Sequence, residues 1–398
     1  MAIKTLDNIN IANKLVLLRI DINSPVVNGK ILENPRFEAA AGTIKELIAK
    51  KAKIAIIAHQ GRKGDTDFLS LEQHAKILSK YVKANIRYID SLFEESALKA
   101  IKELKSGETI LLKNVREYVD EKLPFKKGNH YQELCRLFNL YINDAFSVSH
   151  RAQGSIVLPP KYLTSVIGKN FESELKALEK FRFNKNNKIT LLLGGAKVED
   201  LLPLFNLLRY KQNKILASGI LANLLLIAKG YNLGYEENWL REKSYFSLIP
   251  KLKKLYKKYQ SQIILPIDFG LNLNNKRINS YLEEAPFKNK ICDVGNKTIK
   301  LFKQNLLDTN FIFMKGPLGF SEIPEFSIGT KEILTFLSMK TKNKEAFTLL
   351  GGGHLTTTLE RYKLPKTFSY ISLSGGALIA YISGEKLPGL LAIEKSRK

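Results

Sequence analysis

Short apolar runs alternate with longer amphipathic segments along nearly the whole chain. This alternation is typical of βαβ units, in which helices join parallel strands and cover the sheet. The apolar runs predict strands at 15–19, 54–58, 109–112, 141–143, 189–193, 215–217, 263–265, 311–314, 347–350 and 370–372. Apolar residues at helical spacing predict helices at 37–50, 71–83, 201–210, 221–229 and 297–305. The predicted fold class is therefore α/β with parallel sheets.

The chain has 398 residues, a length that suggests two domains. Between its halves lies FESELKALEKF, residues 171–181, which has a helical pattern and is followed by the polar segment FNKNNK. We interpret the helix as a stiff connector. The expected domains are residues 1–170 and 171–384.

The two halves differ in the residues that follow their predicted strands, where ligands bind in open α/β sheets. The first half carries polar and cationic residues there: Arg19, Asp21, Asn23, His59, Arg62, Arg116, Asn143, Asp144, His150 and Arg151. The second half carries glycine-rich segments: GGAK at 194–197, SGILAN at 218–223, KGPLG at 315–319, GGGHLT at 351–356 and SLSGGA at 372–377. One half is therefore expected to bind a small anion and the other a nucleotide.

Glycine between a strand and a helix lets backbone N–H groups approach phosphate oxygens, and the helix N-terminus adds a favourable dipole. One such loop is weak support, because glycine also serves ordinary turns, but five in one half indicate a phosphate site. The chain has no GxxxxGK[ST] motif, which excludes a P-loop enzyme. It also has no GxGxxG opening a βαβ unit, which weakens a dinucleotide interpretation.

The formal net charge of +25 first suggests a nucleic-acid partner. However, the 50 lysines are spread through nearly every segment, and the densest run, KLKKLYKK at 251–258, is typical of an amphipathic helix with an exposed charged face. By contrast, five of the 13 arginines are expected at or just after strand ends of the first half: Arg19, Arg36, Arg62, Arg116 and Arg151. Because guanidinium groups bind carboxylates and phosphates in a bidentate way, these arginines predict a pocket for a small phosphorylated acid.

Composition excludes other classes of protein. A hydrophobic content of 44% excludes intrinsic disorder. Cys135 and Cys292 lie far apart without a CxxC spacing, so neither a disulfide framework nor a structural zinc site is expected. The start of the chain has no signal-peptide pattern, and its longest apolar stretch, 215–228, is too short and too polar to cross a bilayer. A soluble cytoplasmic protein is expected.

Several spaced motifs together resemble the phosphoglycerate kinase family. They are RIDINSP, HQGR, INDAF followed by HRA, GGAKVED, KGPLG followed by Glu322, GGGH, SGGA and GEKLPG, in collinear order from about residue 14 to about residue 392. DINSP, HQGRKGDTDFLSLEQHA and GGGH are most similar to the archaeal branch. The resemblance implies two Rossmann-like domains joined by a helix, with the C-terminal tail, about 385–398, returning to the N-terminal domain.

The resemblance also implies a phosphotransferase with a carboxyl acceptor (EC 2.7.2.3), which transfers a phosphoryl group reversibly between ATP and 3-phosphoglycerate in glycolysis and gluconeogenesis, with Mg²⁺ on the nucleotide. Arg36 and Lys197 are the implied catalytic residues. The implied ligands of 3-phosphoglycerate are Asp21, Asn23, Arg36, His59, Arg62, Arg116 and Arg151. The implied nucleotide site comprises Lys197, Gly219, Gly316, Glu322, Gly351, Gly352, Gly353, His354, Gly375 and Gly376. No protein ligand of the metal is assigned.

The chain departs from the family pattern at several positions. Leu201 stands where a second lysine is common, and His354 stands where many members have an Asp that helps to hold the metal. Lys315 replaces the Asn before GP, and Ser374 replaces one glycine of the last loop. Lys63 and Lys113 are further departures, near the first-half motifs. The implied transfer residues are all present.

Two other functions remain as alternatives. The altered glycine loops and the high charge are compatible with a catalytically silent descendant that binds nucleotide or polyanions. Another α/β transferase acting on a different phosphorylated acid is disfavoured by the collinear motifs. The expected partners are small molecules, without a membrane or a specific nucleic acid, and the resemblance favours a monomer or dimer.

Overall fold

The computed structural model describes residues 3–180 and 187–396. The chain divides into two compact units, residues 1–180 with 384–398, here called unit 1, and residues 181–383, here called unit 2. The connector predicted at 171–181 is helix α8, Lys169–Lys180, while position 181 lies outside the described residues. The division follows α8 instead of preceding it, because this helix packs on unit 1, with the Phe171 ring 5.1 Å from that of Phe146.

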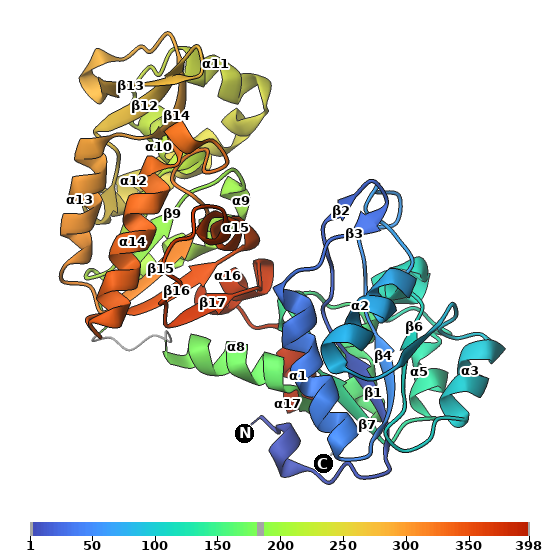
Figure 1. Cartoon of the computed structure of the whole chain (residues 1–398). Coiled ribbons are helices and arrows are strands. Elements are labelled where there is room, and N and C mark those ends of the chain that lie inside the picture. The colour runs from blue at the N-terminus through green and yellow to red at the C-terminus, as the bar shows by residue number, and fades with distance from the viewer. Residues whose placement is uncertain (1–2, 181–186, 397–398) are drawn as a thin grey trace. The chain divides into compact units, whose positions relative to one another are not determined.

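Unit 1 is built on a six-stranded parallel sheet with the order β5-β6-β4-β1-β7-β8 (Figure 1). Its strands are β1 Leu15–Arg19, β4 Lys53–Ile57, β5 Ile86–Ile89, β6 Thr109–Leu112, β7 Leu140–Asn143 and β8 Ser165–Ile167. Arg19, at the end of β1, pairs with Ile57 of β4 and Asn143 of β7. The carboxyl ends of the three central strands are therefore level with one another.

Helices and short connections surround this sheet. The longer ones are α1 Pro35–Ala49, α2 Glu72–Val82, α3 Glu95–Lys102 and α8. Shorter segments are η1 Leu6–Asn8, η2 Val115–Glu117, α4 Val119–Lys122, α5 Tyr131–Cys135, η3 Phe146–Val148, α6 Gly154–Val157 and α7 Pro159–Tyr162, with a hairpin of β2 Val26–Val27 and β3 Lys30–Ile31. Alternate residues of β1 face two separate apolar cores, Val16 and Leu18 one of them and Leu17 the other, so the central strands are covered on both faces.

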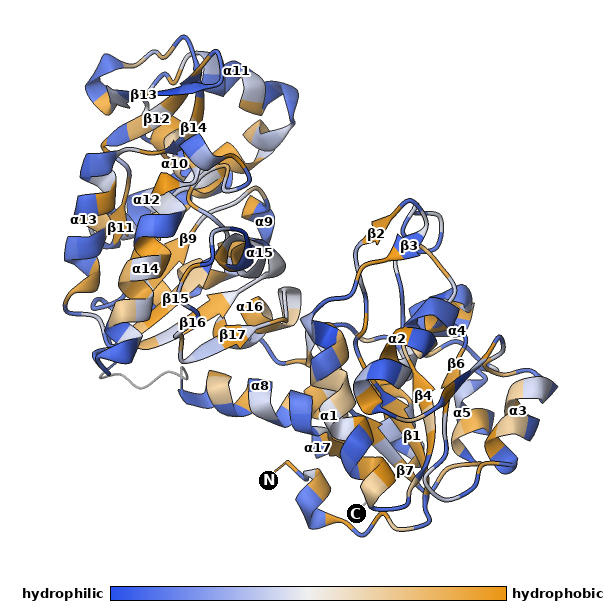
Figure 2. Cartoon of the chain, viewed as in Figure 1, coloured by the Kyte–Doolittle hydropathy of each residue, from blue (hydrophilic) through white to orange (hydrophobic). Residues whose placement is uncertain are grey.

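Unit 2 has a second six-stranded parallel sheet, with the order β11-β10-β9-β15-β16-β17. Its strands are β9 Ile189–Leu193, β10 Lys214–Ala217, β11 Ile263–Ile264, β15 Phe311–Lys315, β16 Phe347–Gly351 and β17 Tyr370–Ser372. The strands of both sheets are predominantly apolar, whereas many helices are apolar on one side only (Figure 2). The predicted α/β class with parallel sheets is confirmed.

The helices of unit 2 follow its strands. They are α9 Val198–Leu201, α10 Gly219–Lys229, α11 Tyr235–Glu242, α12 Ile249–Tyr259, α13 Asn296–Leu306, α14 Ile328–Lys342, α15 Gly353–Arg361 and α16 Gly376–Ile382, with short 3₁₀ turns η5 Tyr245–Leu248, η6 Gln260–Gln262, η7 Leu282–Glu284 and η8 Pro324–Phe326.

The α-helix predicted at 201–210 is wrong in type. The chain forms only one α turn there and continues as the 3₁₀ segment η4, Leu202–Arg209, which has a proline at its start. The run 251–258 lies in α12 with Leu252 buried and its lysines exposed, as expected.

An antiparallel sheet in unit 2 was not predicted. It consists of β12 Asp268–Leu273, β13 Lys276–Tyr281 and β14 Lys290–Val294 in the order β13-β12-β14. The outer strand β13 is largely polar and exposed, so it has no apolar run to reveal it. Arg277 of β13 forms a buried ion pair with Asp293 of β14, at 2.7 Å, which ties the outer strand to the inner one.

The C-terminal segment belongs to unit 1. Helix α17, Pro388–Glu394, packs on α6 and α7, and the Gly389 N–H donates to the Ser149 carbonyl at 2.9 Å. A Cβ atom on Gly389 would lie 2.7 Å from the Ile156 side chain and 2.8 Å from that of Ser149. The tail can approach this closely only because residue 389 is glycine.

We therefore expect Gly389→Val to lower the free energy of unfolding of unit 1 by about 1–3 kcal/mol, because the added side chain overpacks the contact. Urea unfolding followed by circular dichroism measures the change. Lys386→Ala, at an exposed position of the same tail, serves as the control and should stay within about 0.5 kcal/mol of the parent. Equal stability of Gly389→Val and the control would contradict the packing argument.

Candidate active site

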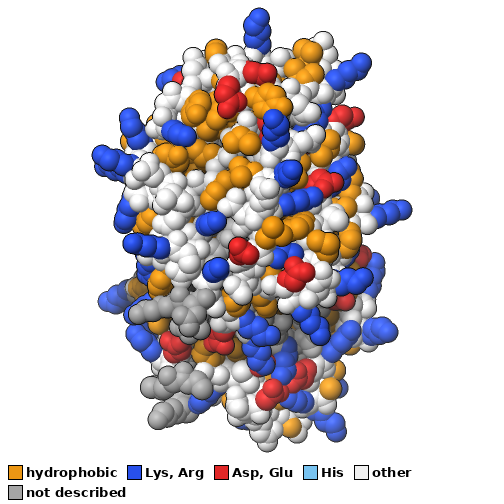
Figure 3. All heavy atoms as spheres, turned by 90° about the vertical axis from the view of Figure 1, so that its left-hand side faces the viewer, with side chains coloured by type: hydrophobic (Ala, Val, Ile, Leu, Met, Phe, Trp, Pro, Cys, Tyr) orange, Lys and Arg blue, Asp and Glu red, His pale blue; other side chains and the backbone are white. Residues whose placement is uncertain are grey.

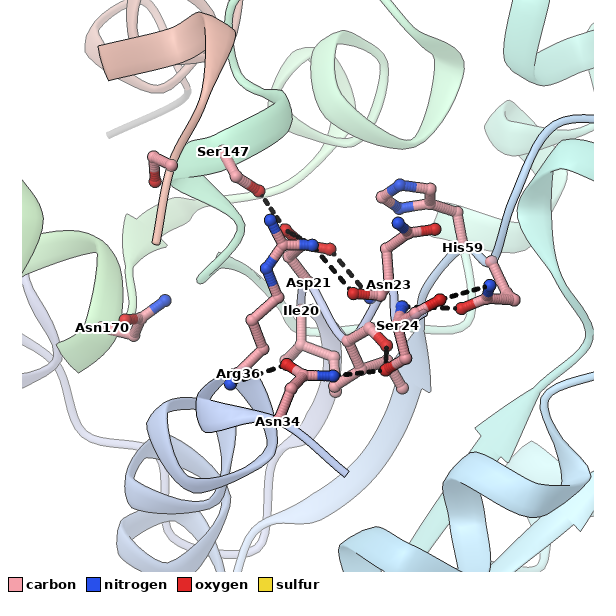
Figure 4. A network of polar contacts seen from close by, with 12 residues as sticks. Ile20, Asp21, Asn23, Ser24, Asn34, Arg36, His59, Ser147 and Asn170 are labelled. Carbon is pink, nitrogen blue, oxygen red and sulfur yellow. Dashed lines mark hydrogen bonds and ion pairs between the residues drawn. The ribbon is translucent and has the colours of Figure 1, made fainter. Parts of the chain in front are cut away.

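The loop that follows β1 carries a buried carboxylate at the edge where the strands of unit 1 end. Asp21 accepts hydrogen bonds from the Ser147 hydroxyl and, at 3.1 Å, from the Asn23 backbone N–H. Arg36 forms an ion pair with the carboxylate oxygen that also accepts from Ser147, with 3.4 Å between Nη1 and Oδ2. Figure 4 shows the Arg36 guanidinium pointing toward Asp21 and Asn23. The structure thus brings together three of the predicted site residues.

Arg36 is positioned differently from the sequence prediction. It lies in the first turn of α1 and not after a strand. Asn34 caps this helix by accepting the Arg36 N–H at 3.1 Å, and its amide donates to the Ser24 hydroxyl at 2.7 Å. The Arg36 guanidinium also donates to the Asn23 carbonyl at 2.8 Å. The helix start and the loop after β1 therefore fix Arg36 together.

The ends of neighbouring elements add further cationic and imidazole groups. His59 lies with Nδ1 3.1 Å from Arg19 Nη2, and the Arg116 guanidinium donates to the Gly61 carbonyl. Arg151 Nε donates to His150 Nε2 at 3.2 Å. These contacts tie the predicted residues to the loops that carry them.

Arg62 is different from the other predicted arginines. It is exposed, and its side chain makes no hydrogen bond or ion pair with another residue of the described ranges. It therefore extends from the HQGR loop without a fixed protein partner.

The pKa values of these groups reflect a crowded positive environment. Burial opposes ionisation of Asp21, but the charge of Arg36 and the hydrogen bonds from Ser147 and the Asn23 backbone hold its pKa well below the ordinary value. Burial and the charges of Arg19 and Arg116 keep the pKa of His59 well below its ordinary value despite Asp21. The imidazole is therefore neutral at pH 7.

Arg116 has the same surroundings. Burial and the neighbouring charges of Arg19 and Arg151 lower its pKa to about 10, so it remains protonated at neutral pH. An anion bound beside it would relieve this repulsion. The cluster of arginines in unit 1 therefore favours a ligand with several negative charges.

Sequence reasoning missed a buried network behind the cluster. Gln60 accepts from the Ser24 N–H at 2.8 Å and donates to the Ser24 carbonyl at 2.9 Å, so it holds the loop that carries Asn23. His74 on α2 reaches Gln60 with 3.1 Å between Nε2 and Oε1. Gln60 could have been suspected from the sequence, because it lies in HQGR between two predicted site residues, His59 and Arg62. His74 lies within the motif HQGRKGDTDFLSLEQHA, but nothing in the motif singled it out from its helical pattern.

The glycine loops of unit 2 pack backbone against backbone. The Gly194 N–H donates to the Lys315 carbonyl and the Gly195 N–H to the Pro317 carbonyl, both at 2.9 Å. Gly316 has φ +76°, and a Cβ atom there would lie 2.4 Å from the Gly194 carbonyl oxygen. The loops after β9 and β15 can meet only with glycine at this position.

The remaining predicted nucleotide residues lie at or near the carboxyl ends of strands of the same sheet. Gly219 opens α10, Gly353 opens α15 and Gly376 opens α16, and Gly351 closes β16. Gly352 and Gly375 are the N-cap residues of α15 and α16. Lys197 is exposed at the N-cap position of α9. Several helix N-termini thus surround the glycine loops, as the sequence pattern predicts for a phosphate site.

Glu322 and His354 form an exposed pair beside these loops. His354 Nδ1 lies 3.6 Å from Glu322 Oε1, and Arg361 holds the Glu322 carbonyl at 2.6 Å. The two residues come from the loop after β15 and from the first turn of α15. This contact places the implied ribose ligand next to the residue that replaces the family's Asp.

No group of three or more His, Cys, Asp or Glu suited to hold a metal ion occurs within residues 3–180 and 187–396. Mg²⁺ is commonly held by substrate phosphates and water with only one or two carboxylates. The donor set of the chain therefore fits a metal that arrives with the nucleotide. It does not form an all-protein metal site.

Comparison with known proteins places the chain in a family. The family model for phosphoglycerate kinase matches residues 6–385. The phosphoglycerate kinases of Archaeoglobus fulgidus and Saccharolobus solfataricus are 38% and 37% identical to the chain, over 98% and 100% of its length and 96% and 98% of theirs. The crystal structure of phosphoglycerate kinase from Pyrococcus horikoshii OT3 matches with a TM-score of 0.89 and 32% identity, covering 98% of each chain. The structure of phosphoglycerate kinase from Coxiella burnetii matches with a TM-score of 0.82 and 27% identity, covering 100% of each chain.

The chain belongs to the phosphoglycerate kinase family. The resemblance to its archaeal branch is confirmed, since archaeal members match over nearly the whole chain.

The excess of positive charge is not gathered into one surface on the face drawn in Figure 3. Lys and Arg side chains there lie among acidic, apolar and uncharged ones. No helix in the described ranges combines the length and apolar character that crossing a membrane requires. The arginines clustered at the strand ends of unit 1 therefore differ from the basic side chains that are scattered over this face.

The buried histidine of the network generates a pH prediction. Burial lowers the pKa of His74 to about 4, whereas an unfolded histidine titrates near 6.5. Between these values the unfolded chain binds a proton that the folded chain does not, so stability falls as the pH falls from about 6.5 to about 4. We expect His74 to account for about 2–3 kcal/mol of that loss.

Urea unfolding at a series of pH values measures this effect. His74→Gln, which cannot titrate, should show a shallower decline than the parent over the same window. His130→Gln, at a half-exposed histidine of the same unit, is the matched control. Parallel pH profiles for His74→Gln and the parent would show that His74 does not titrate as described.

Proposed function

We propose that the two units divide the substrates of the phosphoglycerate kinase reaction between them, with 3-phosphoglycerate on unit 1 and the nucleotide on unit 2. The chain is a phosphotransferase that transfers a phosphoryl group reversibly between ATP, with Mg²⁺, and 3-phosphoglycerate, giving ADP and 1,3-bisphosphoglycerate. The observation that carries this function is the family match over residues 6–385, within which Arg36 and Lys197 are both intact.

The unit 1 cluster suits an acid with a carboxylate and a phosphate. The proposed ligands are Asp21, Asn23, Arg36, His59, Arg62, Arg116 and Arg151. Arg36 and Arg116 are oriented by backbone carbonyls, so their guanidinium groups lose little further freedom on binding. Asp21 and neutral His59 offer hydrogen-bond partners for the hydroxyl group of the substrate.

The unit 2 loops suit a nucleotide. Helix N-termini and backbone N–H groups would receive the phosphates, while Glu322 would accept from the ribose hydroxyls. Lys197 would meet the phosphates and the group in transfer. Because His354 contacts Glu322, binding of the ribose would have to rearrange that exposed pair.

The chemistry requires positioning and charge stabilisation. The acceptor carboxylate is already ionised at neutral pH, so no general base is needed. Phosphoryl transfer proceeds through a loose, in-line transition state that is stabilised by fixed positive groups, and we assign Arg36 and Lys197 to this role. Mg²⁺, when bound, offsets charge on the phosphate oxygens. Since the ligands lie on different units, transfer requires that the units bring them together and exclude water.

The expected partners are the small-molecule substrates. We further propose a cytoplasmic protein that acts as a monomer or dimer without a specific nucleic acid. The Lys and Arg side chains scattered over the face shown in Figure 3 support the absence of a specific nucleic-acid partner. No comparison favours a catalytically silent descendant.

The first test is a coupled assay of the purified chain with ATP, Mg²⁺, 3-phosphoglycerate and glyceraldehyde-3-phosphate dehydrogenase, following NADH oxidation. We expect turnover in the parent and a loss of kcat of roughly 10²–10³-fold in Lys197→Ala, because a preorganised charge is removed. Lys76→Ala, an exposed lysine of unit 1, should retain the parent rate. A parent rate no higher than that of Lys197→Ala would refute the function.

A second test addresses the anion cluster. Arg36→Ala should lower kcat/KM for 3-phosphoglycerate by about 10²–10³-fold and leave the KM for ATP nearly unchanged, because Arg36 belongs to unit 1. Arg87→Ala removes an exposed arginine of the same unit and should have no effect. If Arg36→Ala changed the KM for ATP alone, the division of substrates between the units would be wrong.

A further inference from the structure

Lys315 is the last residue of β15 and lies between two glycine loops. It pairs in register with Leu193, which precedes Gly194, and with Gly351 on the other side. Its side chain crosses toward the second loop, since its Nζ lies 2.8 Å from the position that a Cβ on Gly352 would take. The ammonium group is therefore located among the loops assigned to the nucleotide phosphates.

The environment of this ammonium group is unusual for a lysine that is largely removed from solvent. No hydrogen bond or ion pair of its Nζ occurs within the described part of the chain. Lys340, in the same unit, shows the usual solution for a buried lysine, because it donates to the Leu307 carbonyl at 2.9 Å and pairs with Glu345 at 3.2 Å. An unpaired ammonium in such a place is costly unless an anion joins it.

The charged residues near Lys315 do not remove the cost of burying its unpaired ammonium group. Burial lowers the pKa of Lys315, the charge of Asp200 raises it, and the charge of Lys197 lowers it again. The charge of Lys197 thus acts on Lys315 across the loops, and Asp200 is the carboxylate that offsets it. A phosphate bound between the two lysines would satisfy both.

The position of the family's second lysine on α9 gives a reason for this arrangement. That position is Leu201, whose side chain is 2% exposed and contributes to the core of unit 2. Helix α9 therefore presents one lysine, Lys197, to the loops. The missing charge is present instead on the adjacent strand.

We propose that Lys315 is a phosphate-binding residue of the nucleotide site that replaces, from β15, the cation absent at position 201. The inference rests on the proposed nucleotide role of unit 2. Because Lys315 is recessed at a strand end whereas Lys197 is exposed, Lys315 binds a phosphate that ATP and ADP share, and Lys197 serves the group in transfer. Lys315 thus contributes to nucleotide affinity more than to the chemical step.

Calorimetric titration of ADP and of ATP into the full chain tests the proposal. Lys315→Met should weaken both dissociation constants by a similar factor, roughly 10- to 100-fold, as expected for loss of a charge-assisted contact. Lys315→Arg should stay within a few-fold of the parent. Lys342→Met is the matched control, because Lys342 is an exposed lysine of unit 2 at the end of α14, which leads to the opposite edge of the sheet.

Two results would overturn the proposal. One is an ADP dissociation constant in Lys315→Met that equals that of Lys342→Met. The other is an equal loss in Lys315→Met and Lys315→Arg, which would indicate a packing role. In steady state the KM for ATP should rise while kcat changes less and the KM for 3-phosphoglycerate stays constant.

If Lys315→Met does not fold, chemical labelling of lysines in the parent chain tests the same contact. ADP, but not adenosine, should protect Lys315 from an amine-reactive reagent, as read by peptide mass spectrometry. Unchanged labelling of Lys315 with saturating ADP would refute its contact with phosphate. If the parent chain turns over but Lys315→Met binds ADP as tightly as the parent, only this inference is rejected. If ADP binding depends on Lys315 but the parent chain shows no turnover, only the proposed reaction is rejected.

Discussion

Parallel pairing of strands in register is the constraint on which the chemistry of this protein depends. Because every strand of the two large sheets runs in the same direction as its neighbours, the carboxyl ends of each sheet meet at one edge. Arg19 is level with Ile57 and Asn143 in unit 1, and Lys315 with Leu193 and Gly351 in unit 2. Residues distant in sequence become neighbours through backbone hydrogen bonding alone.

The same edge is used differently in the two units. Unit 1 concentrates charged side chains around Asp21, and the buried Glu121 adds a second carboxylate that accepts from the Ser155 N–H at 2.7 Å and its hydroxyl at 2.8 Å. Ser155 in turn accepts from the fully buried Arg19 at 3.0 Å. These acceptors make a crowded group of cations tolerable in the absence of a ligand, since each buried charge has a hydrogen-bonded neighbour.

Much of this organisation was predictable, because each central strand is an uninterrupted apolar run followed by polar residues or glycine. The ten predicted strands all exist, with ends shifted by at most one residue. The antiparallel sheet was missed because β13 is polar, and the two edge strands of the unit 1 sheet, β5 and β8, were also not predicted. Arg36 was expected after a strand but lies on α1, and its place depends on Asn34 and Ser24. Such tertiary hydrogen bonds leave no periodic signal in a sequence.

The two units differ in how they present positive charge at the strand ends, and this difference bears on how much of the net charge the proposed site uses. Backbone N–H groups at helix starts attract phosphates without adding net charge, so under the proposed division of substrates unit 2 would need few lysines where unit 1 would need several arginines. A site built mostly from dipoles would tolerate the movement of one cation from a helix to a neighbouring strand, as we propose for Lys315, because the dipoles keep their geometry. A bidentate arginine pocket does not tolerate such a move, since its recognition depends on the direction of each guanidinium group. Four departures from the family pattern, at Leu201, Lys315, His354 and Ser374, lie in unit 2. The two in unit 1, Lys63 and Lys113, leave every predicted 3-phosphoglycerate ligand matching the pattern.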